Sequence, residues 1–310
     1  PYSNHFDVSQ STDSPDGFSK SYKLDINTVD ASIGSGQYVA IRQRIEAQNL
    51  QQLAFGTSGA KPITLSFYVR SNKTGTFAIN IQQTDNSSKQ VSAPYTISSA
   101  NTWERKTFTF AGDTSGVIND DTGTGLTVIW WLSAGSTYNS GTSRSTFTAH
   151  ADADAAVGCN VNILDSTDNN FYLTGVQLEV GSQATDFEHR SHAEENLLCQ
   201  RYFQILKGGF NVASSSSNMV FSAPLYCVMR ATPSAGKINI SGSNSTFEFG
   251  DMVSIADHST STPTFDGGYI HQDLMVTGGI AGFDNLTAYR SYKHEPNATN
   301  GALITADAEL

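Results

Sequence analysis

The segment from Ile63 to Arg70 constrains the fold of this chain most strongly, because apolar residues alternate there with polar or amphipathic ones over eight positions. Successive side chains of a β-strand point to opposite faces of the sheet, so a period of two predicts a strand with one buried face. Turn residues from Ser71 to Gly75 separate this segment from a second alternating run over residues 77–81. The two runs are therefore predicted to form a β-hairpin.

Further strands, each bounded by Gly, Ser, Asn or Asp, are predicted at residues 38–45, 103–110, 125–132 and 171–180. Regularly spaced short strands predict an all-β protein with a jelly-roll-like β-sandwich. The apolar parity of the last strand shifts around Thr174 and Gly175, so a β-bulge is expected there. The polar segment 135–170 lacks periodicity and is expected to form extended loops.

A helix is predicted from residue 191 to about residue 202, because Ser191 and Glu194 have the S-x-x-E spacing of a capping box. A partly apolar stripe of about three turns is too short to be stable alone, so this helix is expected to pack on another surface. Short β-like runs follow it at residues 218–221, 225–229, 237–240, 246–249, 273–276, 286–290 and 303–306. We therefore expect a jelly-roll-like domain at residues 1–190, a short helical connector at 191–203 and a second, smaller β-sandwich domain at 204–310.

Composition narrows the class of partner. Hydrophobic residues make up 38% of the chain and charged residues 15%, which is typical of a compact globular protein rather than a disordered one. The net charge is −11 and no cluster of Lys or Arg interrupts it, so nucleic acid is not expected as a partner. No run of about 18 apolar residues is present, so membrane insertion is not expected either.

The cysteines indicate the compartment of assembly. Cys159, Cys199 and Cys227 are odd in number and lack C-x-x-C spacing, so a complete disulfide framework is not expected and assembly in a reducing cytoplasm fits best. The sequence begins at Pro1 with polar residues rather than with a basic and apolar leader. We therefore expect no signal peptide, and expect that sequence upstream of Pro1 is missing.

Several segments resemble a known family. The segments GTSGAKPITLSFYVRS (56–71), KTGTF (73–77), ANTWE (100–104) and TGVQLEVG (174–181) resemble a carbohydrate-binding-module-like sandwich that is common in phage tail proteins. The segments FEHR (187–190) and CQRYF (199–203) belong to the same pattern, and MRATP (229–233) and ADAEL (306–310) are similar to the ends of phage tail-fibre subunits. The chain thus resembles the receptor-binding part of a bacteriophage tail fibre. The segment LYCV at residues 225–228 departs from the family pattern.

The resemblance implies a protein of the virion, located in the tail fibre and assembled in the cytoplasm of the bacterial host. It implies a homotrimer that binds other phage tail or virion proteins. Its C-terminal domain would contact a glycan or another receptor on the host surface, while the first domain supports it. Two alternatives stay open, namely a capsid-attached fibre or decoration protein, and an accessory carbohydrate-binding module of a secreted hydrolase.

Adjacent tryptophans offer a first candidate for sugar contact. Trp130 and Trp131 lie in one predicted strand, so one of the two must point away from the core. Leu126, Val128 and Leu132 share the parity of Trp130, which makes Trp131 the outward residue. We expect Trp131 either to contact a sugar or to lie against a loop, a neighbouring subunit or the second domain.

Other aromatic and polar residues complete the set of candidate ligand contacts. Tyr68 faces outward by the same parity, and is expected either to share a platform with Trp131 or to pack against a neighbouring strand. Tyr138 lies in the long polar segment. In the second domain a Gly-rich and Thr-rich stretch, expected to form exposed loops for receptor contact or merely solvated loops, carries His258, Tyr269 and His271 beside Asp257 and Asp273.

Metal, cofactor and catalytic signals are weak. The carboxylates of Asp152, Asp154, Asp165 and Asp168 are of the type that binds calcium, but they lack an EF-hand pattern and are expected to form a solvated acidic loop. No G-x-S-x-G elbow, P-loop, H-E-x-x-H motif or β-helix repeat is present. We therefore expect no metal ion, no cofactor and no enzymatic activity, although the sequence does not exclude a pair of carboxylates in a groove.

Overall fold

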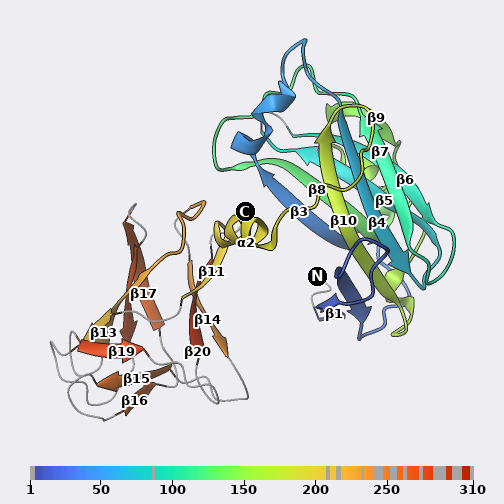
Figure 1. The fold of residues 1–310 in the computed structure, drawn as a ribbon. Helices are drawn as coiled ribbons and strands as arrows, with labels where there is room; N and C mark the ends of the chain where they lie inside the picture. Colours follow the sequence, from blue (N-terminus) through green and yellow to red (C-terminus); the bar gives the residue numbers. More distant parts are fainter. Residues whose placement is uncertain are drawn as a thin grey trace. The chain divides into compact units, whose positions relative to one another are not determined.

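The computed structural model divides into two compact units, Pro1–Glu188 and His189–Leu310, which are drawn in Figure 1. It describes residues 4–85, 88–206, 210–213, 218–231, 234–239, 247–251, 257–260, 264–271, 275–281, 291–294 and 302–307. Both units consist mainly of β-strands, which confirms the predicted all-β class.

The first unit is a sandwich of two five-stranded antiparallel sheets. The first sheet contains, in spatial order, β1 (Phe6–Ser11), β2 (Ser21–Ile26), β10 (Asn170–Val180), β4 (Ile63–Ser71) and β7 (Glu104–Phe110). The second sheet contains β3 (Tyr38–Glu46), β8 (Thr124–Ala134), β5 (Gly75–Gln83), β6 (Lys89–Ile97) and β9 (Arg144–Ala149). A 3-10 helix, η1 (Ala47–Leu53), follows β3.

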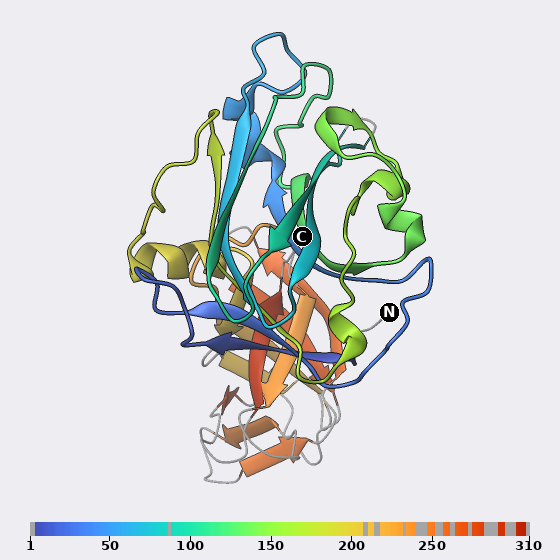
Figure 2. The same cartoon turned by 90° about the vertical axis from the view of Figure 1, so that its right-hand side faces the viewer.

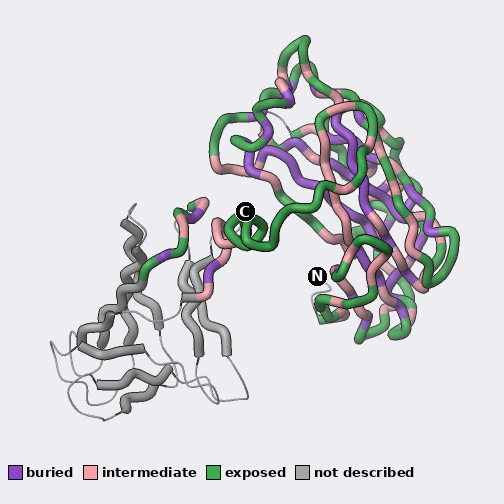
Figure 3. Tube along the Cα trace, in the orientation of Figure 1, coloured by how far each residue is buried: buried purple, intermediate pink, exposed green. Residues whose placement is uncertain are grey.

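The hydrophobic core lies between the two sheets, and its buried residues are among those coloured purple in Figure 3. The odd-numbered residues of β4, which the alternating pattern placed inward, are all fully buried from Ile63 to Val69. At the centre, the ring of Phe67 contacts Tyr95 of β6 and Trp130 of β8 edge-on, with centroids 5.6 and 5.7 Å apart. Aromatic contacts therefore tie the two sheets together.

The prediction that residues 63–70 and 77–81 form a hairpin is wrong. Both runs are strands, but β4 pairs with β10 and β7, whereas β5 pairs with β6 and β8 in the other sheet. The chain therefore crosses from one sheet to the other after β4. A period of two reveals which face of a strand is buried, but it does not reveal which strand becomes the partner.

The bulge predicted in β10 is confirmed. The register of β10 against β4 shifts between Thr174 and Gln177, and Gly175 has a φ of +58°. A Cβ atom on Gly175 would lie 2.7 Å from Cζ of Phe18 and 3.0 Å from Cδ2 of Tyr68. Both the backbone conformation and the neighbouring rings therefore require glycine at this position.

Gly175→Ala is expected to lower the free energy of unfolding by about 1–3 kcal/mol, because a side chain would be strained at this φ and would displace two rings. Urea denaturation of the full chain measures the change. Gly36→Ala is the matched control, because its Cβ would meet nothing within 4 Å, and a change within about 0.5 kcal/mol is expected. Equal losses in the two variants would contradict the role assigned to Gly175.

The segment 135–170 is more structured than the extended loops predicted for it. It contains α1 (Ser136–Asn139), β9, η2 (Asp152–Asp154) and η3 (Ile163–Asp165), and Figure 2 shows it in light green beside the second sheet. The strand β9 lies at the edge of that sheet, and its side chains do not alternate between buried and exposed. The period that reveals other strands is therefore absent from its sequence.

The predicted helix is present as α2 (His192–Gln200) in the second unit. Its cap is confirmed, because the hydroxyl of Ser191 accepts a hydrogen bond from the backbone N–H of Glu194 at 3.2 Å. Leu197 and Leu198 remain 54% and 45% exposed. Within the described residues, nothing buries the apolar stripe that was expected to pack on another surface.

The second unit contains two further antiparallel sheets. The smaller one consists of β11 (Phe203–Leu206), β20 (Ala302–Asp307) and β14 (Ser234–Asn239). The larger one consists of β16 (Asp257–Thr260), β15 (Phe247–Asp251), β19 (Ser291–His294), β12 (Phe210–Ala213), β13 (Asn218–Pro224), β18 (Met275–Ala281) and β17 (Thr264–His271). No helix among the described residues is long and apolar enough to cross a membrane.

The strand predicted at residues 225–229 is wrong, and the one predicted at 286–290 lies outside the described residues. Leu225 and Met229 are buried, as an alternating strand would require, but the side chain of Gln204 takes the place of a strand partner. Its carbonyl oxygen accepts from the N–H of Tyr226, and its amide donates to the carbonyl of Cys227. A buried amide thus satisfies backbone groups that a sheet would otherwise pair.

Candidate functional site

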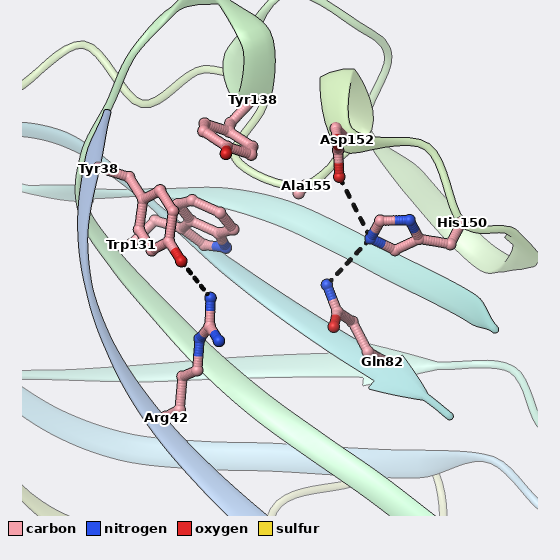
Figure 4. Close-up of a pocket in the computed structure, with 8 residues that line it drawn as sticks. All are labelled: Tyr38, Arg42, Gln82, Trp131, Tyr138, His150, Asp152 and Ala155. Carbon is pink, nitrogen blue, oxygen red and sulfur yellow. Dashed lines mark hydrogen bonds and ion pairs between the residues drawn. The ribbon is translucent and has the colours of Figure 1, made fainter. Parts of the chain in front are cut away.

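A pocket of about 210 Å³ opens on the outer face of the second sheet of the first unit, the face opposite the core (Figure 4). Strands β3, β5 and β8 and the segment after β8 supply its lining residues, which are Tyr38, Arg42, Gln82, Trp131, Tyr138, His150, Asp152 and Ala155. This volume is below the ~300–1,000 Å³ of sites for drug-sized ligands, so the pocket suits one small ring.

Three aromatic rings form one side of the pocket. Trp131 faces away from the core as its parity predicted, and its ring centroid lies 5.1 Å from that of Tyr38 and 5.3 Å from that of Tyr138. These two rings leave Trp131 only 2% exposed, so it packs against Tyr138 of the segment after β8, and sugar contact through Trp131 stays a prediction. The structure thus brings together Trp131 and Tyr138, which were both predicted as candidates, and adds Tyr38, which was not predicted from the sequence.

The polar groups of the pocket are divided between two ends. Arg42 lies at one end, where its guanidinium donates to the hydroxyl of Tyr38 at 2.8 Å. At the other end, Nε2 of His150 lies 3.3 Å from the amide nitrogen of Gln82 and 3.8 Å from a carboxylate oxygen of Asp152. A positive and a negative group thus face the pocket from opposite sides (Figure 4).

The indole N–H of Trp131 is buried and has no hydrogen-bond partner within the structure. Figure 4 shows this nitrogen on the side of the ring toward Gln82. A buried donor that lacks a partner costs about 1–3 kcal/mol. An acceptor that reached this N–H would recover that free energy.

Asp154 lies between Asp152 and Ala155, two residues that line the pocket, and its own side chain is only 8% exposed. Its carboxylate accepts from the N–H of Thr142 at 2.7 Å and from Nε of Arg144 at 2.8 Å. The Thr142 N–H and, after it, the Arg144 guanidinium hold the pKa of the Asp154 carboxyl below its usual value. Asp154 is therefore a structural group, not part of the solvated acidic loop that was expected.

Asp154→Asn is expected to change how stability depends on pH. Because the folded-state pKa lies below the unfolded value of about 3.9, the carboxylate stabilises the folded chain above about pH 4 and loses this effect as the pH falls through the folded pKa. The gap in Tm between parent and variant is therefore expected to narrow from about pH 7 to about pH 3. The exposed Asp152→Asn is the control, and a gap for Asp154→Asn that stays constant with pH would contradict this role.

Tyr68 lies elsewhere. It projects from the outer face of the first sheet, where its ring lies 5.4 Å from that of Phe18 and 6.0 Å from the guanidinium of Arg105. Trp131 projects outward from the second sheet, so the two residues do not form the shared platform that was one of the two alternatives for Tyr68. Parity gave the outward direction of each side chain, but the two sheets of a sandwich expose opposite faces.

The candidates of the second unit lie in strands rather than in the loops predicted for them. His258 belongs to β16, and Tyr269 and His271 belong to β17. Their side chains lie outside the described part of the structure, so receptor contact through them stays a prediction. Among the described residues, no group of three or more His, Cys, Asp or Glu side chains is placed to hold a metal ion. Asp165, one of the acidic residues considered for calcium, pairs with Lys73.

A second aromatic cluster, formed by Trp103 and Tyr172 at the first sheet, was also not predicted from the sequence. The indole N–H of Trp103 donates to Asp13 at 3.0 Å, and its ring lies 6.1 Å from that of Tyr172. Arg70 pairs with the same Asp13 and lies 4.9 Å from the ring centre of Tyr172. The indole N–H and the guanidinium are satisfied within the protein, in contrast to the indole N–H of Trp131.

Comparison with known proteins yields structural overlaps but no family. No family model matches the chain, and no curated protein does. A family 16 carbohydrate-binding module overlaps at 13% identity, with 58% of this chain and 89% of the module covered and a TM-score of 0.29. Tailspike protein 4 of bacteriophage CBA120 overlaps at 14% identity and a TM-score of 0.32, with 56% of this chain but only 18% of the tailspike chain covered.

An exo-beta-agarase overlaps at 13% identity and a TM-score of 0.29, with 63% of this chain and 27% of the agarase covered. The chain thus spans only a small part of the tailspike and of the agarase. At such low scores and identities, these overlaps carry no weight for function, which has to be inferred from the pocket itself.

Proposed function

We propose that the chain is an adhesive protein whose first unit binds a saccharide in the pocket formed by Tyr38, Trp131 and Tyr138. The observation that carries this proposal is the buried, unpartnered indole N–H of Trp131 among three contacting aromatic rings. Aromatic rings offer apolar faces to the C–H groups of a sugar, and a few polar groups fix its orientation. A small pocket that offers both is suited to one sugar residue of a longer chain.

Binding without cleavage fits the charges of the pocket. Glycoside hydrolysis generally requires two carboxyl groups on either side of the scissile bond. Asp152 is the one carboxylate among the residues that line this pocket, and it faces His150. In this proposal the pocket binds a saccharide, and the residues that line it include no second acid for hydrolysis.

The resemblance of the segments at residues 56–71 and 174–181 to phage tail proteins supports a place for this adhesive unit in a tail fibre. In this proposal the chain is a homotrimer of the virion, assembled in the bacterial cytoplasm, bound to other tail proteins and attached to a glycan of the host surface. The exposed Leu197 and Leu198 of α2 support association, because two further copies of the chain would cover them.

Two measurements on the full chain test this function. Multi-angle light scattering is expected to give three copies per particle, and an array of purified bacterial surface polysaccharides is expected to show binding to a restricted set. A monomer that binds common plant or algal polysaccharides would favour an accessory module of a hydrolase instead. Release of reducing sugar from a bound polysaccharide would contradict the adhesive role.

A further inference from the structure

The structure also indicates which class of sugar fits the pocket. We infer that it selects an acidic sugar, a uronic acid residue whose carboxylate pairs with Arg42 while its ring lies against Trp131 and Tyr138. This inference rests on the proposed saccharide binding and specifies its ligand.

Arg42 carries the positive charge that the protein leaves unmatched in this pocket. Its guanidinium contacts the hydroxyl and the ring of Tyr38, but no carboxylate within the described residues pairs with it. Arg70, Arg144 and Arg190, in contrast, each hold a carboxylate within the chain. A guanidinium has five N–H donors in a planar fork that matches a carboxylate, and most of those of Arg42 are free for a ligand.

The arrangement of the other polar groups favours the same ligand. The unpartnered N–H of Trp131 lies between the two ends of the pocket and would donate to a ligand oxygen that reached it. Asp152 and Gln82 lie at the end away from Arg42 and offer acceptors to sugar hydroxyls. A uronic acid has a carboxylate on one side of its ring and hydroxyls on the other, so it matches this division of donors and acceptors.

Neutral and basic sugars match the pocket less well. A neutral sugar would leave the charge of Arg42 without a partner, and an amino sugar would bring a second positive charge near it. Asp152 does not change this preference, because it already faces His150. The net charge of −11 repels acidic polymers in general, so a preference for them would have to come from a local site.

Isothermal titration calorimetry of the full chain tests the inference. The probes are polysaccharides that contain glucuronate, galacturonate or mannuronate, each compared with the same polymer after reduction of its carboxyl groups to alcohols. At least one acidic polymer is expected to bind roughly ten- to a hundredfold more tightly than its reduced form, the effect of one charge-assisted pair. Arg42→Gln is expected to abolish this preference, and Arg44→Gln on the same strand is the control for the loss of one charge.

The outcomes separate this inference from the proposed function. If an acidic polymer and its reduced form bind equally, and Arg42→Gln changes neither, the acidic specificity is overturned while saccharide binding stands. If Arg44→Gln lowers the preference as much as Arg42→Gln, general charge accounts for it and the assignment of Arg42 is overturned. If no surface polysaccharide binds, acidic or neutral, the proposed function itself fails.

Discussion

Phe67→Ala is expected to lower the free energy of unfolding of the sandwich by about 3–5 kcal/mol, the typical range for loss of a buried aromatic ring. Phe67 is fully buried and contacts Tyr95 and Trp130 of the opposite sheet and Phe108 of its own sheet. The substitution removes a ring that contacts both sheets, and the close-packed side chains around it relax only partly into the cavity that is left.

Guanidinium denaturation followed by tryptophan fluorescence measures this loss, because Trp130 lies against Phe67 in the core. Phe6→Ala in the edge strand β1 is the matched control, since Phe6 is only partly buried. It is expected to cause a markedly smaller loss. If the two variants lose the same stability, the packing between the sheets does not have the central role described for it.

Tyr138→Ala is expected to weaken saccharide binding by roughly thirtyfold or more, the effect of removing about 2 kcal/mol of contact at the centre of a binding site. Tyr138 packs on Trp131 and Tyr38 but is only half-buried, so the sandwich is expected to stay folded without its ring. Calorimetry with a polysaccharide that binds the parent chain measures the change.

Tyr68→Ala provides the matched control for Tyr138→Ala. Tyr68 is also a half-buried tyrosine in contact with aromatic neighbours, but it lies on the outer face of the other sheet. Its removal is expected to leave the affinity unchanged within about twofold, or roughly 0.4 kcal/mol. A large loss of affinity for Tyr68→Ala with none for Tyr138→Ala would place the binding site on the first sheet.

Much of the sandwich follows from local patterns in the sequence. Alternation placed the odd-numbered residues from 63 to 69 inward, the parity shift at Gly175 predicted the bulge, and the S-x-x-E spacing predicted the cap of α2. These features depend on neighbours in the sequence and on the period of a strand. The partner of each strand depends instead on contacts far along the chain, so the crossing between β4 and β5 was not predicted.

The candidate site was predictable only in part for the same reason. Parity gave the direction of Trp131, and Tyr138 was named as a candidate, but nothing local to either residue showed that they meet. Tyr38 and Arg42 lie on β3, which becomes a neighbour of Trp131 only through the pairing of β3 with β8. Asp152 and Ala155, which also line the pocket, follow the edge strand β9. Because the side chains of β9 do not alternate between buried and exposed, this part of the sheet was not predicted from the sequence.

The most direct test of saccharide binding uses the three tryptophans of the chain, whose indole N–H groups give separate signals in a nitrogen-edited NMR spectrum. Titration with a bound saccharide is expected to shift the signal of Trp131 and to slow its exchange with water, because the ligand supplies an acceptor. Trp103, bonded to Asp13, and Trp130, inside the core, are expected to stay unchanged. An unchanged Trp131 signal at saturating ligand would contradict binding in this pocket.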